Sequence, residues 1–201
     1  MKFLKILVLT AFLFVNGSYV NAQSNYSLCS YLATIKGTSN FNAWKERIEK
    51  IFGSGEVRKN LDKSFTLQVF KIVMQVNSIK CDEYPILNSS TRKALKADKF
   101  PEITFILDEP IANICCGLSP YSIMASGRLT IAGVTREVTM PMKITFSEDK
   151  KMMIDGTYEV KMTDYGIAPP SVLWGIVKAK DLITISFTTT FLANNRIIAS
   201  N

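Results

Sequence analysis

The sequence contains no histidine among its 201 residues, and this absence excludes several kinds of site. A Ser-His-Asp or Cys-His catalytic arrangement cannot form without it, and zinc, haem and non-haem iron lose their commonest ligand. Gly53-Ser54-Gly55 is not followed by the Lys and Ser or Thr of a phosphate-binding loop. We interpret the adjacent carboxylates Asp108-Glu109 and Glu148-Asp149 as solvated turn charges. We therefore predict no enzyme activity, no metal site and no cofactor.

Dense clusters of Lys and Arg with interleaved aromatic residues are also absent. A nucleic-acid partner is therefore not expected. The formal net charge is +7, and removing Lys2 and Lys5 lowers it to +5. This modest and scattered excess favours solubility, and it would also support transient contact with an anionic membrane surface.

Long apolar runs are missing except at the start of the chain. A nearly unbroken apolar run extends from Leu4 to Val15, next to Lys2 and Lys5, and Val20-Asn21-Ala22 offers light residues for cleavage. This pattern predicts a secretory signal peptide over residues 1–22. The run is shorter than the ~20 residues of a membrane-spanning helix, which argues against an anchor. We expect a soluble exported protein, periplasmic or secreted, with residues 23–201 forming one domain.

Four cysteines lie after the predicted cleavage point: Cys29, Cys81, Cys115 and Cys116. An exported protein meets an oxidising compartment, so an even number of cysteines favours disulfides. The adjacent pair is not expected to bridge to itself. Two schemes remain open, Cys81 with Cys115 and Cys29 with Cys116, or the exchange of partners. A thiolate metal site is not favoured, because the paired spacing of such sites is missing.

The most regular pattern in the chain extends from Ser126 to Phe146 and predicts two strands joined by a turn at Ala132-Gly133-Val134. After the turn, apolar and polar side chains alternate with a period of two, which is typical of a sheet with one dry and one wet face. The apolar face carries Val138, Met140, Met142, Ile144 and Phe146. The polar face carries Glu137, Thr139, Lys143 and Thr145. Pro141 cannot donate to a ladder and therefore implies a bulge or a sheet edge.

Similar alternation predicts seven to nine mostly antiparallel strands and an all-β fold, either a sandwich or a closed barrel. The other strand candidates are residues 31–39, 65–79, 102–107, 152–162 and 183–191. Residues 40–52 fit a helix or a strand, and Gly53-Ser54-Gly55 is expected to end that segment. Ser89-Ser90-Thr91 offers an N-cap for a short helix over Arg92–Asp98. Pro169-Pro170 excludes a strand there, and one or two helical turns are expected within Val172–Lys180.

Four segments, taken together and in this order, resemble the YceI-like family of exported, lipocalin-like, lipid-binding proteins. They are IKGTSNFNAW (residues 35–44), RKALKADKFPEITF (92–105), GRLTIAGVTREV (127–138) and YEVKMTDYGIAPP (158–170). The likeness spans residues 35–191. Members of the family often carry a histidine in the early segment, where this chain has Phe41-Asn42.

This resemblance implies a single antiparallel eight-stranded barrel with one or two short helices. It also implies a bound long-chain amphiphile, such as an isoprenoid quinone, a polyprenol or a fatty acid derivative, in a monomer or homodimer. An eight-stranded barrel leaves an interior that side chains fill or that holds one slim ligand. The runner-up hypothesis is a non-catalytic interaction module with a filled barrel or sandwich core.

Apolar strand faces supply the candidate ligand-binding residues. Those expected to line the interior are Phe105, Met140, Met142, Tyr158, Met162 and Phe187. Methionines suit a cavity that must fit a flexible chain. Tyr165 and Trp174 flank Pro169-Pro170, which we expect at the rim, where their polar tips would meet a head group. Ordinary core packing is the alternative for each of these residues.

Overall fold

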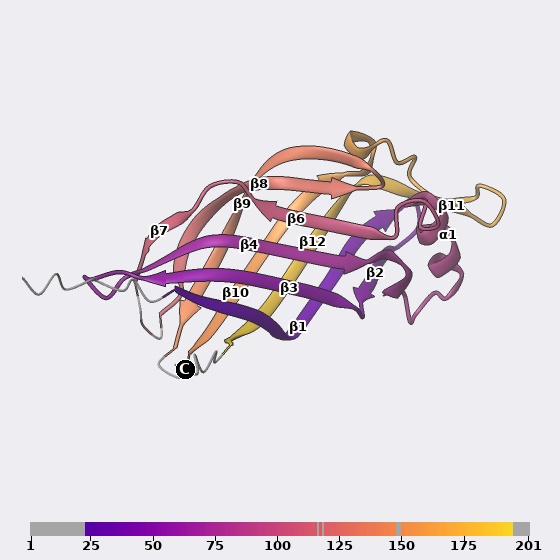
Figure 1. Cartoon of the computed structure of the whole chain (residues 1–201). Helices are drawn as coiled ribbons and strands as arrows, with labels where there is room; N and C mark the ends of the chain where they lie inside the picture. The colour runs from indigo at the N-terminus through magenta and orange to yellow at the C-terminus, as the bar shows by residue number, and fades with distance from the viewer. Residues whose placement is uncertain (1–22, 116, 118, 148–149, 195–201) are drawn as a thin grey trace, which may run out of the picture.

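A computed structural model describes residues 23–147, except 116 and 118, and residues 150–194 (Figure 1). The predicted signal peptide, Cys116 and the Glu148-Asp149 pair lie outside the described residues. The strands are β1 Gln23–Ser39, β2 Ala43–Ile48, β3 Ile51–Lys59, β4 Phe65–Gln75, β5 Ile79–Lys80, β6 Glu102–Leu107, β7 Ile111–Ile114, β8 Tyr121–Ile131, β9 Val134–Phe146, β10 Lys151–Lys161, β11 Ser171–Val172 and β12 Val177–Ala193. The helices are α1 Ile86–Ala94 and the 3-10 turns η1 Val76–Ser78 and η2 Met162–Tyr165.

Eight of these strands close an antiparallel barrel, as the sequence predicts. The ring runs β1-β3-β4-β6-β8-β9-β10-β12, and β12 pairs with β1 along almost its whole length, which closes the ring. The short strands β2, β5 and β11 extend the sheet at one end, where α1 also lies (Figure 1). We call this the mouth end. The opposite end, where β7 pairs with the start of β4, is the closed end.

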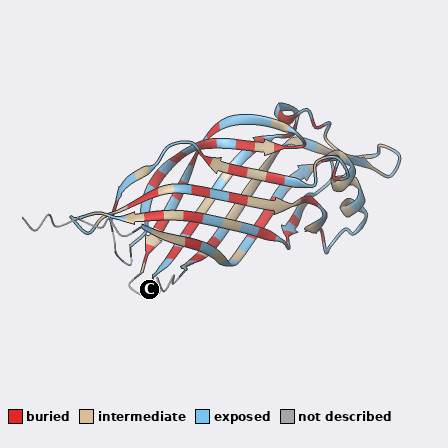
Figure 2. Ribbon diagram, in the orientation of Figure 1, coloured by how far each residue is buried: buried red, intermediate tan, exposed pale blue. Residues whose placement is uncertain are grey.

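Alternating burial along the strands confirms the predicted faces (Figure 2). In β9 the five residues of the predicted apolar face are buried, whereas Glu137, Thr139 and Lys143 are exposed. The β8–β9 turn places Ala132 and Gly133 at φ 49° and 82°. Positive φ at both central residues matches the right-handed twist of the flanking strands, so the two-residue hairpin holds its register.

Pro141 lies at a partial sheet edge, one of the two predicted possibilities. On one side of β9, the strand β8 pairs with it without a break past Pro141. Pairing with β10 begins only at Met142, which faces Gly156. From Val134 to Pro141, therefore, β9 has one partner strand, and the missing N–H of proline removes no ladder hydrogen bond on the other side.

The long apolar segment from Phe65 contains a bulge that explains why both of its faces are apolar. Glu56 of β3 faces Val69, and Val57 faces Leu67, so one residue of β4 is left without a partner. Leu67 and Phe70 are therefore both buried although their spacing is odd. An extra residue in one strand shifts the inward parity beyond it.

Three local predictions were wrong, and the first concerns Gly53-Ser54-Gly55. These residues lie inside β3 and do not end a segment. A side chain at Gly53 would collide with Ile72 and Phe191, so the glycine gives two core residues the space they occupy. Residues 40–52 form β2 and the start of β3, not a helix.

The helix also begins earlier than predicted. It spans Ile86–Ala94 instead of Arg92–Asp98, so Ser89, Ser90 and Thr91 lie within it and do not cap it. Pro85 precedes the first turn, where its fixed φ suits a helix start. Lys96, with a φ of 53°, ends the segment because this left-handed conformation cannot continue an α-helix.

Residues 172–180 do not form helical turns. β11 and β12 make a short hairpin, in which Ser171 faces Lys178 and Val172 faces Val177. Leu173, Trp174 and Gly175 all have positive φ between them, which reverses the chain. Within the described residues, no helix has the length and apolarity to cross a lipid bilayer.

Aromatic and aliphatic side chains pack together at the closed end. Phe146 stacks on Phe65 with ring centroids 4.5 Å apart and meets Tyr26 edge-on at 6.2 Å. Met152 and Ile154 of β10 are fully buried beside them. Such close packing resembles an ordinary protein core.

Candidate functional site

The mouth end contains an apolar cavity of about 240 Å³ between β2, α1 and the β11–β12 hairpin. Its lining consists of Ser39, Phe41, Asn42, Ala43, Trp44, Glu46, Tyr84, Ile86, Leu87, Thr91, Pro170, Val172, Leu173, Val177 and Ala179. We call it the mouth cavity. Phe41 and Ile86 are exposed at its rim. Glu46 is the one charged residue in this lining.

Two smaller apolar voids lie deeper along the barrel. The middle cavity, of about 60 Å³, lies beneath α1 and includes Ile35, Ala94, Ile131, Met162 and Ile185 in its lining. The inner cavity, of about 40 Å³, lies halfway along the strands and is lined by Ile51, Phe70, Ile72, Met74, Phe105, Leu129, Met140, Met142, Tyr158, Ile185, Phe187 and Thr189. Ile185 lines both voids, so the two adjoin.

Trp44, Glu46, Thr91 and Pro170 line both the mouth cavity and the middle cavity. We call these four residues the neck. The mouth, middle and inner cavities thus follow one another from the open end toward the centre of the barrel. All three are lined mainly by apolar side chains.

Trp44 reaches its place in the neck because its partner on β1 has no side chain. Gly37 faces Trp44 across the β1–β2 ladder. A Cβ atom at Gly37 would overlap the indole ring. A second glycine makes room for an aromatic ring deeper in the barrel, where a Cβ atom at Gly156 would overlap the ring of Phe187.

Glu46 is a buried carboxyl group in this apolar neck, with 2% of the residue exposed. It points inward because β2 alternates: Glu46 and Ile48 are buried, and Lys45 and Arg47 are exposed. The Thr91 hydroxyl of α1 donates a 2.6 Å hydrogen bond to Glu46 Oε1. Among the described residues, no hydrogen bond reaches Oε2. Burial raises the pKa of Glu46 above 4.5, and the Thr91 bond opposes this only partly.

Six of the eight predicted ligand-binding residues line the voids. Phe105, Met140, Met142, Tyr158 and Phe187 line the inner cavity. Met162 lines the middle cavity. Their contact with a ligand stays a prediction.

The other two predicted residues lie elsewhere. Tyr165 is buried without lining any of the three cavities. Burial, with a smaller contribution from Tyr158, raises the pKa of Tyr165 to about 12. Trp174 is 98% exposed at the tip of the β11–β12 hairpin and does not line the mouth cavity.

The sequence analysis missed Glu46 and Thr91 as site residues. A signal for Glu46 was present, since the two-residue period of AWKERI places it on the same face as Trp44 and Ile48. No such signal marks Thr91, because the sequence predicts a helix that begins after it, at Arg92. Its role depends on α1 starting at Ile86.

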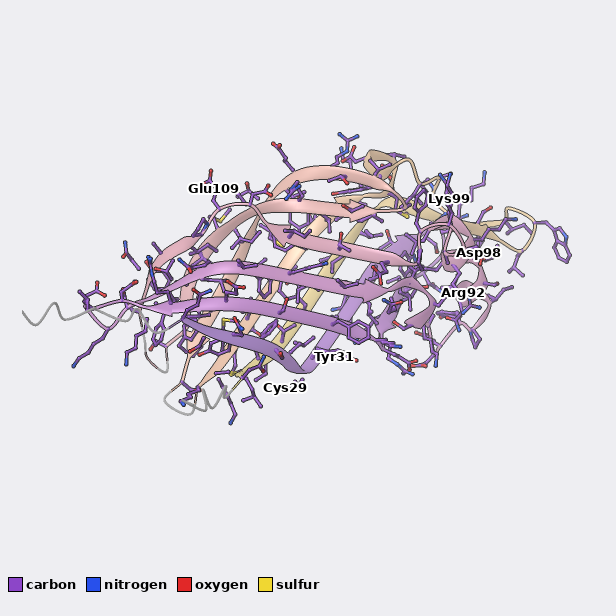
Figure 3. All side chains as sticks on the ribbon, viewed as in Figure 1. Cys29, Tyr31, Arg92, Asp98, Lys99 and Glu109 are labelled. Atoms are coloured by element: carbon purple, nitrogen blue, oxygen red, sulfur yellow. The ribbon has the colours of Figure 1, made fainter. Side chains whose placement is uncertain are left out.

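The described cysteines are free thiols. Cys29 lies on the outer wall of β1 (Figure 3), where its thiol contacts the Thr190 carbonyl oxygen at 3.2 Å. Cys81 is buried at the mouth end, whereas Cys115 follows β7 at the closed end. The length of β4, roughly 30 Å at ~3.3 Å per residue, separates them. A disulfide needs Cα atoms within about 7 Å, so the predicted Cys81–Cys115 bridge is wrong.

An open groove of about 590 Å³ marks the outer wall where β9 and β10 begin to pair. Exposed Leu32 and Met124 lie in it beside polar residues such as Lys143 and Asp155. It shares Met142 and Phe187 with the inner cavity. The part of the chain that the structure describes contains no group of three Cys, Asp or Glu side chains able to hold a metal ion.

A closed antiparallel barrel with a series of apolar voids defines a lipocalin-like architecture. The YceI-like domain model matches residues 21–191, most of the chain, and the protein belongs to this family. A comparison with curated proteins gave no match.

Solved structures confirm the fold. A polyisoprenoid binding domain from Saccharophagus degradans, implicated in plant cell wall breakdown, is 13% identical, with a TM-score of 0.65 over 84% of this chain and 98% of that one. BcnA of Burkholderia cenocepacia is 16% identical, with a TM-score of 0.59 over 80% and 95%. A YCEI protein of Campylobacter jejuni is 16% identical, with a TM-score of 0.54 over 75% and 85%.

Proposed function

We propose that this protein is an exported carrier that holds a long-chain amphiphile, such as an isoprenoid quinone, a polyprenol or a fatty acid derivative, inside its barrel. The observation that carries the proposal is the series of three adjoining apolar cavities from the mouth to the barrel centre. Membership of the YceI-like family, and the structural similarity to the polyisoprenoid binding domain of Saccharophagus degradans, support it.

Burial of the chain supplies the affinity in this proposal. Each methylene that leaves water contributes about 0.8 kcal/mol. The middle and inner voids, at about 60 and 40 Å³, are smaller than a long chain and must widen. Met74, Met140 and Met142 line the inner void, and flexible thioether side chains can turn aside at low cost.

A cavity-filling substitution tests the proposal. Ala94→Phe places a ring in the middle cavity, which Ala94 lines. We expect this variant to lose most of its uptake of geranylgeraniol and hexadecanol, measured by native mass spectrometry of the mature chain. The matched control is Ala112→Phe, because Ala112 is exposed on β7 at the closed end and adds the same ring outside the barrel.

The control variant should bind as the wild type does. Equal uptake by Ala94→Phe, Ala112→Phe and wild type would contradict binding inside the barrel. No uptake by the wild type would contradict lipid binding itself.

Loading from a membrane is part of the proposal. Leu173, Trp174 and Ile176 are exposed at the β11–β12 tip beside the mouth cavity. Cationic Lys178 and Lys180 are exposed on the adjoining strand β12. Figure 3 places Arg92 and Lys99 at the same end of the molecule. Aromatic tips flanked by cations suit the interface of an anionic bilayer.

Trp174→Ser tests this contact. We expect it to weaken binding to phosphatidylglycerol vesicles about tenfold, since the apolar anchor is lost. Leu61→Ser is the matched control, because Leu61 is 86% exposed in the β3–β4 turn at the closed end. If both variants bind as the wild type does, the hairpin tip is not the contact.

Export is also a proposal. The predicted signal peptide ends at Ala22, and β1 begins at Gln23. Mass spectrometry of protein recovered outside the cytoplasm should give a mature chain that starts at Gln23. Recovery of the full 201-residue chain only, inside the cytoplasm, would contradict export.

The outer groove favours a second candidate function, a protein-interaction module. Exposed Leu32 and Met124 would contact the partner there. A stoichiometric protein partner lost in Met124→Asp but retained in Ala94→Phe would support this function. A partner retained equally by Met124→Asp and Ala94→Phe would contradict contact at the groove.

A further inference from the structure

The neck contains one ionisable group and no cation. The residues that line the mouth and middle cavities include Glu46 but no Lys or Arg. The cationic neighbours of Glu46 on β2, Lys45 and Arg47, are exposed on the outer face of the strand. Arg47 is held there by Glu49 and Asp82. A head group that reaches the neck therefore meets a carboxyl without a counter-ion.

The geometry of the carboxyl leaves one oxygen available. Thr91 donates to Oε1 at 2.6 Å, which fixes the orientation of the group. Among the described residues, Oε2 has no hydrogen-bond partner, and Glu46 lines the cavities on both sides of the neck. In the part of the chain that the structure describes, no fully buried side-chain nitrogen or oxygen lacks a hydrogen-bond partner, so Oε2 is accessible from the cavity. A ligand atom in the neck can therefore bind to it.

We propose that Glu46 and Thr91 form a head-group subsite that selects long chains ending in a hydrogen-bond donor without negative charge, such as an alcohol, and rejects anionic heads. An ionised carboxylate accepts a hydrogen bond from the hydroxyl, and a protonated carboxyl donates one to the hydroxyl oxygen. An alcohol is therefore bound in either state.

A phosphate or carboxylate head has no comparable arrangement. Beside an ionised Glu46 it meets a like charge at low dielectric. Beside a protonated Glu46 it would be a buried anion without a cation, which is costly. This proposal rests on the proposed carrier function, because the subsite would bind the polar head of the same chain that the barrel holds. The chain itself would extend past Ile185 toward the inner cavity.

The experiment compares geranylgeraniol with geranylgeranyl phosphate, which share one chain and differ in the head. The mature wild type should bind the alcohol at least about tenfold more tightly, a difference that one charged hydrogen bond can supply. Glu46→Gln keeps the size and the Thr91 bond but removes the charge. It should retain the alcohol and reduce the alcohol-to-phosphate ratio about tenfold. Thr91→Val should weaken alcohol binding through loss of the orienting hydroxyl.

Glu159→Gln is the matched control, because Glu159 is exposed on β10 and the same charge is removed. It should leave the ratio unchanged. Equal wild-type affinity for the two probes, or an unchanged ratio in Glu46→Gln, would overturn the subsite while carrier function stands. Binding of neither probe by the wild type would overturn carrier function instead.

Discussion

At the scale of single residues, Glu46 is the feature that ordinary folding does not explain. Strand parity turns it inward, and one hydroxyl is its only hydrogen-bond partner in the described chain. Neighbouring charges contribute nothing to its raised pKa, whose main cause is burial. A buried carboxyl without a cation lowers stability. Residues of this kind are concentrated at functional sites.

Glu46→Gln should therefore stabilise the protein at neutral pH. Well below pH 4.5 the carboxyl is protonated in both folded and unfolded wild type, and the variant has little advantage. As the pH rises, the unfolded chain releases its proton while the folded chain keeps it, so wild-type stability falls until the raised folded pKa is passed. The melting temperature of Glu46→Gln should therefore exceed that of the wild type by an amount that grows as the pH rises through this range. A difference in melting temperature that is the same at all pH values would contradict a raised pKa of Glu46 in the folded protein.

Thiol labelling tests the free cysteines. Cys29 and Cys115 are exposed, whereas Cys81 is 1% exposed. We expect iodoacetamide, added without reductant, to modify Cys29 and Cys115 in the folded protein and Cys81 only after unfolding. A disulfide-linked peptide that contains Cys81 in a non-reducing digest would contradict this structure.

At the scale of elements, the sequence predicts the strands and hairpins in which apolar and polar side chains alternate. The β8–β9 hairpin follows from a period of two and from the turn residues at Ala132-Gly133. The parity of β10 and β12 follows in the same way. These patterns are local, so no tertiary information is needed to identify them.

The missed elements depend on tertiary contacts. Gly53 belongs to a strand because Ile72 and Phe191 occupy its side-chain space. The helix start at Pro85 competed with a plausible cap at Ser89, and single-sequence capping signals cannot rank the two. Leu173 and Trp174 adopt positive φ without being glycines, which no local signal predicts.

Strand glycines position the aromatic residues of the site, and this gives a prediction for the β1–β2 pair. Gly37→Ala should destabilise the protein by about 1–3 kcal/mol, because the new methyl overlaps the Trp44 ring. The chain has two tryptophans, so Trp44 is the only one left in a Trp174→Phe background. Its emission should shift to longer wavelength as the ring moves toward solvent.

Gly55→Ala is the control for this prediction. A methyl there meets its nearest neighbours at 3.4 to 3.6 Å, which is ordinary contact. It should change stability by less than about 1 kcal/mol, as expected for glycine and alanine in a strand. Equal losses in the two variants would show that Trp44 does not depend on Gly37.

At the scale of the whole molecule, the barrel has two unlike halves. Stacked aromatic residues pack at the closed end, and three adjoining cavities follow one another from the mouth end to the barrel centre. The sequence predicts the barrel but not this division, because lining and packing residues share the same alternation. Met142 of the voids and Phe146 of the closed end lie on one face of β9.

The central claim is that the mouth half accommodates an amphiphile. Native mass spectrometry of the protein as purified, with chloroform extraction of the same sample, tests it most directly. We expect an added mass that matches an extractable long-chain alcohol or related uncharged amphiphile, and loss of that mass in Ala94→Phe. The mass of the bare chain alone, with no extractable lipid and no uptake of added geranylgeraniol, would contradict the account.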